Sequence, residues 1–353
     1  MREKDNFDFL RFVASMFVII GHSYYLLNEA SQEPLTRLTG SIYFGLLTGR
    51  IYFGLLGVYI FFVISGYLVV QSYERNPNFL SFIRNRILRI FPALIAAIIF
   101  AAFIIGPFVT ILSLNDYLSH PDTWGYLESI LLYKIHYNLP GVFANNPYPN
   151  AVNGSLWVLP FLSIMYLILY CYGTFGFIKK RSIILFLHFS LLYLVIFKSQ
   201  ALQQLSIRYI GDGLTLASFY IYFSSGMLYY LYKDRIKLDY GAVLCMLVLW
   251  IVSFNTNILT YTSYLFIPYL IIWFAFVPWK FANEFGKYGD FSYGIYVFSF
   301  PIQQTINHLF IHWIDPIRLI LLTSIIVIPI SAISYYLIEA PLLRLKGSQR
   351  IKH

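Results

Sequence analysis

The apolar stretch from Asp8 to Leu27 carries two side chains that do not belong in hydrocarbon, Arg11 and His22. The stretch is long enough to cross a bilayer as one helix. At about 100° per residue, a separation of eleven positions is nearly three turns, so both side chains project from one face, roughly 16 Å apart along the axis. A guanidinium binds anions, and an imidazole exchanges protons near neutral pH. The pair is therefore a candidate functional site, because ionisable residues inside membrane helices usually face a polar cavity or a partner.

Both side chains also have a purely structural explanation. Arg11 could extend to the lipid headgroups at the end of the helix, and His22 could be hydrogen-bonded inside a helix bundle. Asp8 lies three residues before Arg11, which predicts an ion pair between the two. The remainder of the chain has to decide between the structural and the functional interpretation.

A second basic cluster lies in the segment FLSFIRNRILRIFPAL. Arg86 and Arg89 are three residues apart among apolar residues, which predicts a short amphipathic helix on the inner membrane surface that ends before Pro92. Attraction to lipid headgroups explains any basic interfacial helix. Clustered arginines are also natural ligands of phosphate groups, so the alternative is a site for an anionic cytosolic cofactor.

The composition indicates a polytopic membrane protein. Of the 353 residues, 59% are hydrophobic and only 12% are charged, and the mean hydropathy is +0.67, unlike a soluble domain. The net charge of +9 comes from short basic clusters between apolar runs, which argues against a nucleic-acid partner. Neither a disulfide framework nor metal-ligand spacing is visible, so no metal is expected. No cleavage-site pattern follows the first apolar run, so we expect the first helix to be retained.

The apolar runs and their borders predict an all-α polytopic bundle of about ten transmembrane helices, with residues 1–353 forming a single domain. The expected helices cover residues 8–27, 53–73, 90–113, 156–177, 182–198, 212–232, 238–255, 260–279, 291–312 and 317–338. Residues 113–153 are expected to form a long, non-helical outer loop that could cap a substrate cavity. Pro160 and Pro301 are expected to kink their helices.

Small and polar residues predict close contacts between these helices. Ser65 and Gly66 form a notch that permits close backbone approach. In the ninth helix, polar side chains could either bind neighbouring helices or line a cavity, namely Ser292, Ser299, Gln303 and Gln304.

The distribution of basic residues predicts the orientation. With both termini on one side, 18 of the 25 Lys and Arg residues fall on that side. The opposite side carries Arg37, Arg50, Lys134, Lys198, Arg208 and Arg318. Because basic residues concentrate in cytoplasmic segments, both termini are expected to be cytoplasmic.

Taken together, these segments resemble the acyltransferase-3 family of integral membrane acyltransferases. The first-helix signature of that family is an Arg and a His with ten residues between them, which Arg11 and His22 match. Later blocks resemble the family in the same order, namely GVYIFFVISGYLV, RNRILRIFPAL, LPGVF…NGSLW, SYGIYVFSFPIQQ and SYYLIEAPLLRL. The resemblance extends from about Asn6 to Leu345.

The resemblance implies a multi-pass enzyme of the bacterial inner membrane, surrounded by lipid, that transfers an acyl group, most often acetyl. The donor would be cytosolic acyl-CoA, and the acceptor a hydroxyl of a surface polysaccharide or a lipid-linked glycan such as an O-antigen precursor. His22 would act as general base. The other implied roles are catalysis by Arg11, cofactor binding by Arg11, Arg86 and Arg89, and a border of the acceptor site formed by Asn153, Ser155 and Trp157.

One position departs from the family pattern. Related sequences commonly carry an acidic residue shortly after the SLW block, where this chain has Leu162. A carboxylate that could orient the His side chain is therefore missing, and Ser65, Ser163 and Ser299 are the candidates to replace it by depth in the membrane.

Two other functions remain open at the level of sequence. A flippase for lipid-linked oligosaccharides also has about ten helices and buried basic residues, but corresponding broken helices in two halves are expected for it, and no such internal symmetry is visible. A glycan polymerase would be expected to carry catalytic arginines in large external loops, where this chain has few basic residues. The acceptor sugar, the acyl chain and the oligomeric state are not determined by the sequence.

Overall fold

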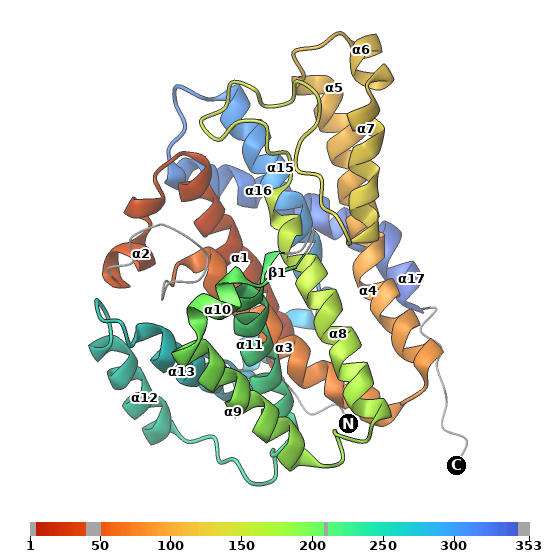
Figure 1. The fold of residues 1–353 in the computed structure, drawn as a ribbon. Helices are drawn as coiled ribbons and strands as arrows, with labels where there is room; N and C mark the ends of the chain where they lie inside the picture. Colours follow the sequence, from red (N-terminus) through yellow and green to blue (C-terminus); the bar gives the residue numbers. More distant parts are fainter. Residues whose placement is uncertain (1–4, 40–50, 208–210, 345–353) are drawn as a thin grey trace.

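The structure, a computed structural model, describes residues 5–39, 51–207 and 211–344, and 77% of it is helical (Figure 1). The longer helices are α1 (Phe7–Leu26), α3 (Phe53–Arg75), α4 (Phe79–Phe100), α8 (Leu159–Thr174), α9 (Arg181–Phe197), α11 (Gly213–Leu231), α12 (Tyr240–Val252), α13 (Leu259–Phe276), α15 (Ser292–Leu309) and α16 (Pro316–Ser334). Shorter helices are α2 (Pro34–Thr39), α5 (Gly106–Val109), α6 (Leu114–Ser119), α7 (Pro121–Gly125), α10 (Ser199–Gln204), α14 (Lys280–Glu284) and α17 (Ala340–Arg344).

The remaining elements are single turns and one strand pair. The 3₁₀ turns are η1 (Ala30–Gln32), η3 (Tyr126–Leu131), η4 (Gly154–Val158) and η5 (Phe285–Tyr288), and the π-helical turns are η2 (Ala101–Ile105) and η6 (Tyr335–Glu339). The strands β1 (Ser206–Ile207) and β2 (Gly211–Asp212) pair antiparallel.

Each of the ten predicted helix ranges overlaps a helix of the structure, and the all-α class is confirmed. Among the described residues, six helical segments are long and apolar enough to cross a membrane: Phe7–Leu26, Phe53–Arg75, Phe79–Val109, Gly154–Thr174, Leu259–Phe276 and Pro316–Arg344. The number of ten spans and the orientation therefore stay predictions. Several basic residues used for the orientation lie outside the described residues, namely Arg2, Lys4, Arg50, Arg208, Lys346, Arg350 and Lys352.

The predicted surface helix before Pro92 is wrong, because α4 runs from Phe79 through Pro92 without a break. The side chain of Asn78 caps its first turn by accepting a hydrogen bond from the backbone N–H of Ser81 (3.0 Å). Pro92 removes one backbone donor, which membrane helices tolerate. Arg86 and Arg89 therefore belong to the lower part of a spanning helix and project into the bundle.

The first half of the outer loop is helical, contrary to the prediction for residues 113–153. The Ser113 side chain caps α6 by accepting the N–H of Asp116 (3.2 Å), and the His120 ring accepts the N–H of Asp122 at the start of α7 (3.2 Å). Pro121 occupies the first turn of α7, a position that suits proline. Only residues 132–153 remain irregular.

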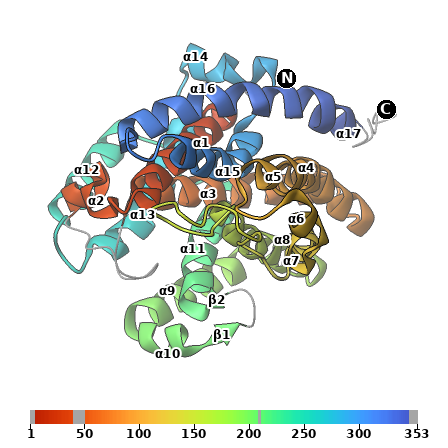
Figure 2. The same cartoon turned by 90° about the horizontal axis from the view of Figure 1, so that it is seen from above.

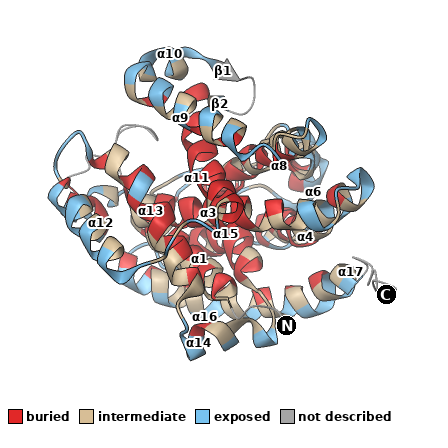
Figure 3. Cartoon of the chain, turned by 90° about the horizontal axis from the view of Figure 1, so that it is seen from below, coloured by how far each residue is buried: buried red, intermediate tan, exposed pale blue. Residues whose placement is uncertain are grey.

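Helix α3 lies at the centre of the bundle, between α1 and α11 (Figure 2). A Cβ added at Gly66 would collide with the carbonyl oxygen of Phe223 on α11, and one added at Gly226 would collide with that of Val63 on α3. The predicted close approach at Gly66 is thereby confirmed. Figure 3 shows the buried residues gathered around α3, α11 and α15, whereas α12 carries none. The apolar exposed surface of α12 is typical of a helix that faces lipid.

The upper half of α15 binds neighbouring segments through its amide side chains. Gln303 donates to the carbonyl oxygen of Ile19 (2.9 Å) and to the hydroxyl of Ser23 (2.7 Å), both on α1. Gln304 donates to the carbonyl oxygens of Tyr148 and Ala151 (2.8 Å each) in the outer loop. Of the two predicted alternatives, these two glutamines therefore bind neighbouring segments and do not line the cavity.

Pro160 and Pro301, the two prolines expected to kink their helices, occupy different positions within them. Pro160 lies in the first turn of α8, directly after the 3₁₀ turn η4, a position that suits proline, and the kink there stays a prediction. Pro301 does lie inside α15, where it leaves the carbonyl oxygen of Val297 without its helical donor. The side-chain amide of Asn153 donates to that oxygen (2.9 Å).

Replacement of Asn153 by Ala is expected to destabilise the protein, because the buried carbonyl of Val297 would lose its donor. The cost of an unsatisfied buried acceptor is about 1–3 kcal/mol, seen as a lower thermal midpoint in detergent. Asn115, an exposed amide on α6, is the matched control, and Asn115→Ala should change stability by less than about 0.5 kcal/mol. Equal midpoints for the two variants would show that Asn153 is dispensable for the packing of α15.

Candidate active site

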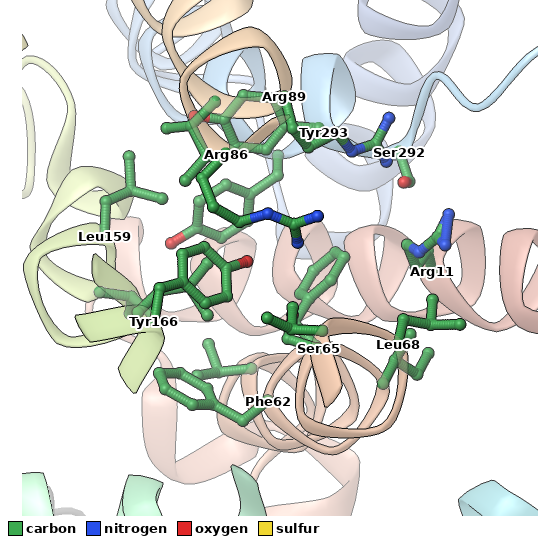
Figure 4. A pocket seen from close by; sticks show the side chains of 18 residues that line it. Arg11, Phe62, Ser65, Leu68, Arg86, Arg89, Leu159, Tyr166, Ser292 and Tyr293 are labelled. Carbon is green, nitrogen blue, oxygen red and sulfur yellow. The ribbon is translucent and has the colours of Figure 1, made fainter. Parts of the chain in front are cut away.

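A cavity of about 130 Å³ lies among α1, α3, α4, α8 and α15 (Figure 4). Its basic wall consists of Arg11, Arg86 and Arg89, which the sequence analysis had grouped as anion-binding residues. Apolar side chains form most of the remaining wall, with contributions from Val58, Phe61, Phe62, Leu68, Val69, Ile90, Val158, Leu159 and Leu162. A guanidinium wall facing an apolar wall suits a ligand that has an anionic and an apolar part.

Asp290, in the short segment before α15, binds two of the three arginines. Its carboxylate forms ion pairs with Arg11 of α1 and Arg89 of α4, and it also accepts hydrogen bonds from the hydroxyl and the N–H of Ser292. Burial disfavours the charged form, but Arg89 and Arg11 outweigh that effect and hold the pKa of Asp290 well below its usual range. The carboxylate is therefore ionised at every physiological pH.

The predicted ion pair between Asp8 and Arg11 is confirmed, with a distance of 2.6 Å between Arg11 Nη1 and Asp8 Oδ1. Arg11 thus has two carboxylate partners, one on its own helix and one before α15. Its charge is fully compensated within the protein.

Arg86 has no such compensation. None of the ion pairs among the described residues includes it. Its guanidinium lies over the rings of Phe82 (5.8 Å) and Tyr166 (5.4 Å), and its buried Nε has no hydrogen-bond partner. Figure 4 shows the Arg86 head group projecting into the middle of the cavity. A half-buried cation without a carboxylate partner is the strongest indication of an anion site among the described residues.

His22 lies outside this cavity, at the other end of α1. Its ring packs at a steep angle against the ring of Phe300 on α15, with ring centroids 5.1 Å apart, and its buried Nδ1 has no hydrogen-bond partner. The three serines proposed to orient it do not do so: Ser163 and Ser299 donate to carbonyl oxygens of their own helices, and Ser65 lines the cavity. Leu162 also lines the cavity, as Arg86 does and His22 does not.

The cavity stops about one helical turn short of the His22 level. Val58 and Tyr296 line it. Gly54 and Phe300, each four positions away from them along the same helix, contact α1 at Gly21 and His22. Four residues of helix correspond to about 6 Å. Arg11 and His22 do occupy two depths of one helix, as predicted, but they do not line one continuous cavity.

The ring of Phe300 separates His22 from the segment that contains the predicted acceptor residues. Phe300 lies between His22 and Gly154, where an added Cβ would be only 2.6 Å from the Phe300 ring. Asn153 and Ser155 on either side of Gly154 are buried, and Ser155 Oγ donates to Asn153 Oδ1 (2.6 Å). Trp157 is half-buried against Phe161 and Phe219. Their role in acceptor binding stays a prediction.

Comparison with known proteins decides the class of the chain. The profile of the acyltransferase-3 family, described as an acyltransferase domain, matches residues 4–336. The chain belongs to the acyltransferase-3 family. This acyltransferase is therefore a transferase enzyme and a multi-pass membrane protein. A protein of Shigella phage Sf6 named O-acetyl transferase is 27% identical to it, over 96% of each chain. No solved structure gives a significant match.

Asp290 of this acyltransferase is a site residue that was not predicted from the sequence. It is an acidic residue at the border of the predicted ninth helix, on the side where Arg11, Arg86 and Arg89 were expected. Opposite charges predicted at the same membrane depth indicate an ion pair, because an isolated charge at that depth is unfavourable. The same reasoning applied to the ninth helix would have selected Asp290 as the partner of the arginines.

Asp290→Asn is expected to lower the thermal midpoint strongly, because two half-buried guanidinium groups would lose their shared carboxylate. Breaking a buried ion pair from one side costs about 3–5 kcal/mol. The matched control is Asp315→Asn, which alters an exposed pair with Arg318 and retains a side chain able to cap α16. If both variants unfold at the same temperature as the unmodified enzyme, Asp290 does not hold these helices together.

Proposed function

We propose that this acyltransferase is an O-acetyltransferase of the bacterial inner membrane. It transfers an acetyl group from acyl-CoA to a hydroxyl of a surface polysaccharide or lipid-linked glycan. The observation that carries this proposal is Arg86, a guanidinium without a carboxylate partner in a largely apolar cavity. The name of the phage relative supports the acetyl group and the hydroxyl acceptor.

The donor is held by its phosphates at Arg86. Asp290 neutralises part of the charge of Arg11 and Arg89, so these two arginines mainly shape the wall, whereas Arg86 keeps its charge for a ligand. Because the basic-residue distribution predicts a cytoplasmic location for this end of α4, the donor enters from the cytosol. The apolar walls suit the remainder of the donor.

His22 is the general base. It accepts the proton of the acceptor hydroxyl as that oxygen attacks the thioester carbonyl; the carbon–sulfur bond then breaks, and the thiolate of CoA leaves and is protonated. A positioned base contributes about 10² to 10⁴ in rate. The free Nδ1 of His22 supports this role, because a histidine kept only for packing would be expected to bury a satisfied ring.

Donor and base meet across the turn of helix that separates the cavity from His22. The wall between them contains Tyr296 and Phe300. The donor therefore extends upward from Arg86 along α15, and the acceptor approaches His22 from the outer side beside Gly154. Transfer then takes place at the level of Phe300.

Arg86→Ala is expected to weaken acetyl-CoA binding to the purified protein by about tenfold or more, because hydrogen bonds to charged groups contribute about 1.5–3 kcal/mol. Arg86→Lys should rescue binding only partly, since Lys lacks the planar fork. Arg84→Ala is the matched control: it removes the same charge from an exposed position two residues away. An affinity that Arg86→Ala leaves unchanged would place the phosphates elsewhere.

His22→Ala is expected to abolish acetyl transfer while acetyl-CoA still binds, because the base acts after binding. The measurement is the O-acetyl content of surface polysaccharide from a deletion strain that carries the variant, together with donor binding by the purified protein. Normal acetylation in that strain would remove His22 from the mechanism. Loss of both binding and fold would instead assign His22 a packing role.

A further inference from the structure

Tyr293 has a buried hydroxyl without a hydrogen-bond partner on the wall of the cavity. Tyr293 Oη and Arg86 Nε are the cavity-lining atoms of this kind among the described residues. Figure 4 shows Tyr293 on the same wall as Arg89. A buried polar group without a partner is rare in native proteins, so each such group requires an explanation.

The neighbouring tyrosine on the same helix shows that packing alone does not account for Tyr293. Tyr296, three residues further along α15, also lines the cavity, and its hydroxyl donates to the carbonyl oxygen of Ser155. The surroundings of α15 thus provide an acceptor for one hydroxyl and none for the other. A phenylalanine at position 293 would fill the same space without the cost of a buried, unsatisfied hydroxyl.

The direction of the helices places Tyr293 between the phosphate site and His22. Helices α4 and α15 run parallel, since Arg89 pairs with Asp290 at one end and the rings of Phe100 and Phe298 lie 5.7 Å apart further along. Arg86 is nearly one turn of α4 before Arg89, and Tyr293 lies in the first turn of α15, just after Asp290. A donor anchored at Arg86 and directed toward His22 therefore passes the Tyr293 hydroxyl.

We propose that Tyr293 Oη donates a hydrogen bond to an amide carbonyl of the pantetheine arm of the acyl donor. This inference rests on the proposed use of acyl-CoA. The phosphates are assigned to Arg86, and the arm attached to them contains neutral amides, whose carbonyl oxygens are acceptors that a phenol can satisfy. Tyr293 is thus a donor-binding residue that neither the Arg/His signature nor the basic cluster indicates.

The test is Tyr293→Phe, with binding of acetyl-CoA and of 3′-phospho-ADP measured on the purified full-length protein. The loss of one neutral hydrogen bond should raise the Kd for acetyl-CoA about three- to tenfold. Binding of 3′-phospho-ADP, which lacks the pantetheine arm, should be unchanged. The thermal midpoint of the free protein should be equal or higher, because the removed hydroxyl has no partner there.

Tyr126→Phe is the matched control, because Tyr126 Oη in η3 is also buried without a partner but does not line the cavity. Its acetyl-CoA affinity should equal that of the unmodified protein. An unchanged acetyl-CoA affinity in Tyr293→Phe overturns the inference, and equal weakening of both ligands would assign the hydroxyl to a phosphate. If the unmodified protein binds neither ligand, the proposed function fails instead.

Discussion

The ion pairs of Asp290 with Arg11 and Arg89 are the interaction on which the rest of the site depends. They join α1, α4 and the start of α15, three segments that are far apart in the sequence. Charges at one end of a helix bundle must be compensated, and Asp8 and Asp290 together match the charges of Arg11 and Arg89. Asp290 pairs with both guanidinium groups only if α1, α4 and the start of α15 keep their relative depth. The ion pairs therefore set the depth of the cavity wall, and among the described residues that line it Arg86 is the arginine without a carboxylate partner.

At the opposite end, the same helix α15 is held by neutral hydrogen bonds. Gln303 binds α1 beside His22, and Gln304 binds the outer loop. Pro301 lies between these contacts and the cavity, and Asn153 satisfies the carbonyl that Pro301 leaves free. Helix α15 thus connects a charged lower end with a neutral upper end, and the cavity and His22 both lie along it.

The two parts of the candidate site, the cavity and the His22 ring, lie close together but are not connected. The cavity with Arg86 and the His22 ring lie on either side of about one helical turn that contains Tyr296 and Phe300. A wall of aromatic side chains thus separates the cavity from the His22 ring.

The sequence by itself determined the class of the protein, the approximate position of its helices and the Arg11 and His22 pair. Long apolar runs, basic borders and helical periodicity are local properties, and the membrane leaves few alternatives to a helix for such runs. Helix ends were predicted less well, because the caps at Asn78, Ser113 and His120 depend on single side chains that have other uses elsewhere.

Only the tertiary structure decided which charges meet. Asp290 is one of 16 acidic residues in the chain. Its place at the border of the predicted ninth helix makes it a candidate partner for an arginine, but only the structure shows that it pairs with both Arg11 and Arg89. The orphan hydroxyl of Tyr293 and the partner of the Val297 carbonyl are equally non-local. The physical reason is that hydrogen bonds and ion pairs of a membrane bundle are formed between helices, whereas periodicity and hydropathy describe each helix alone.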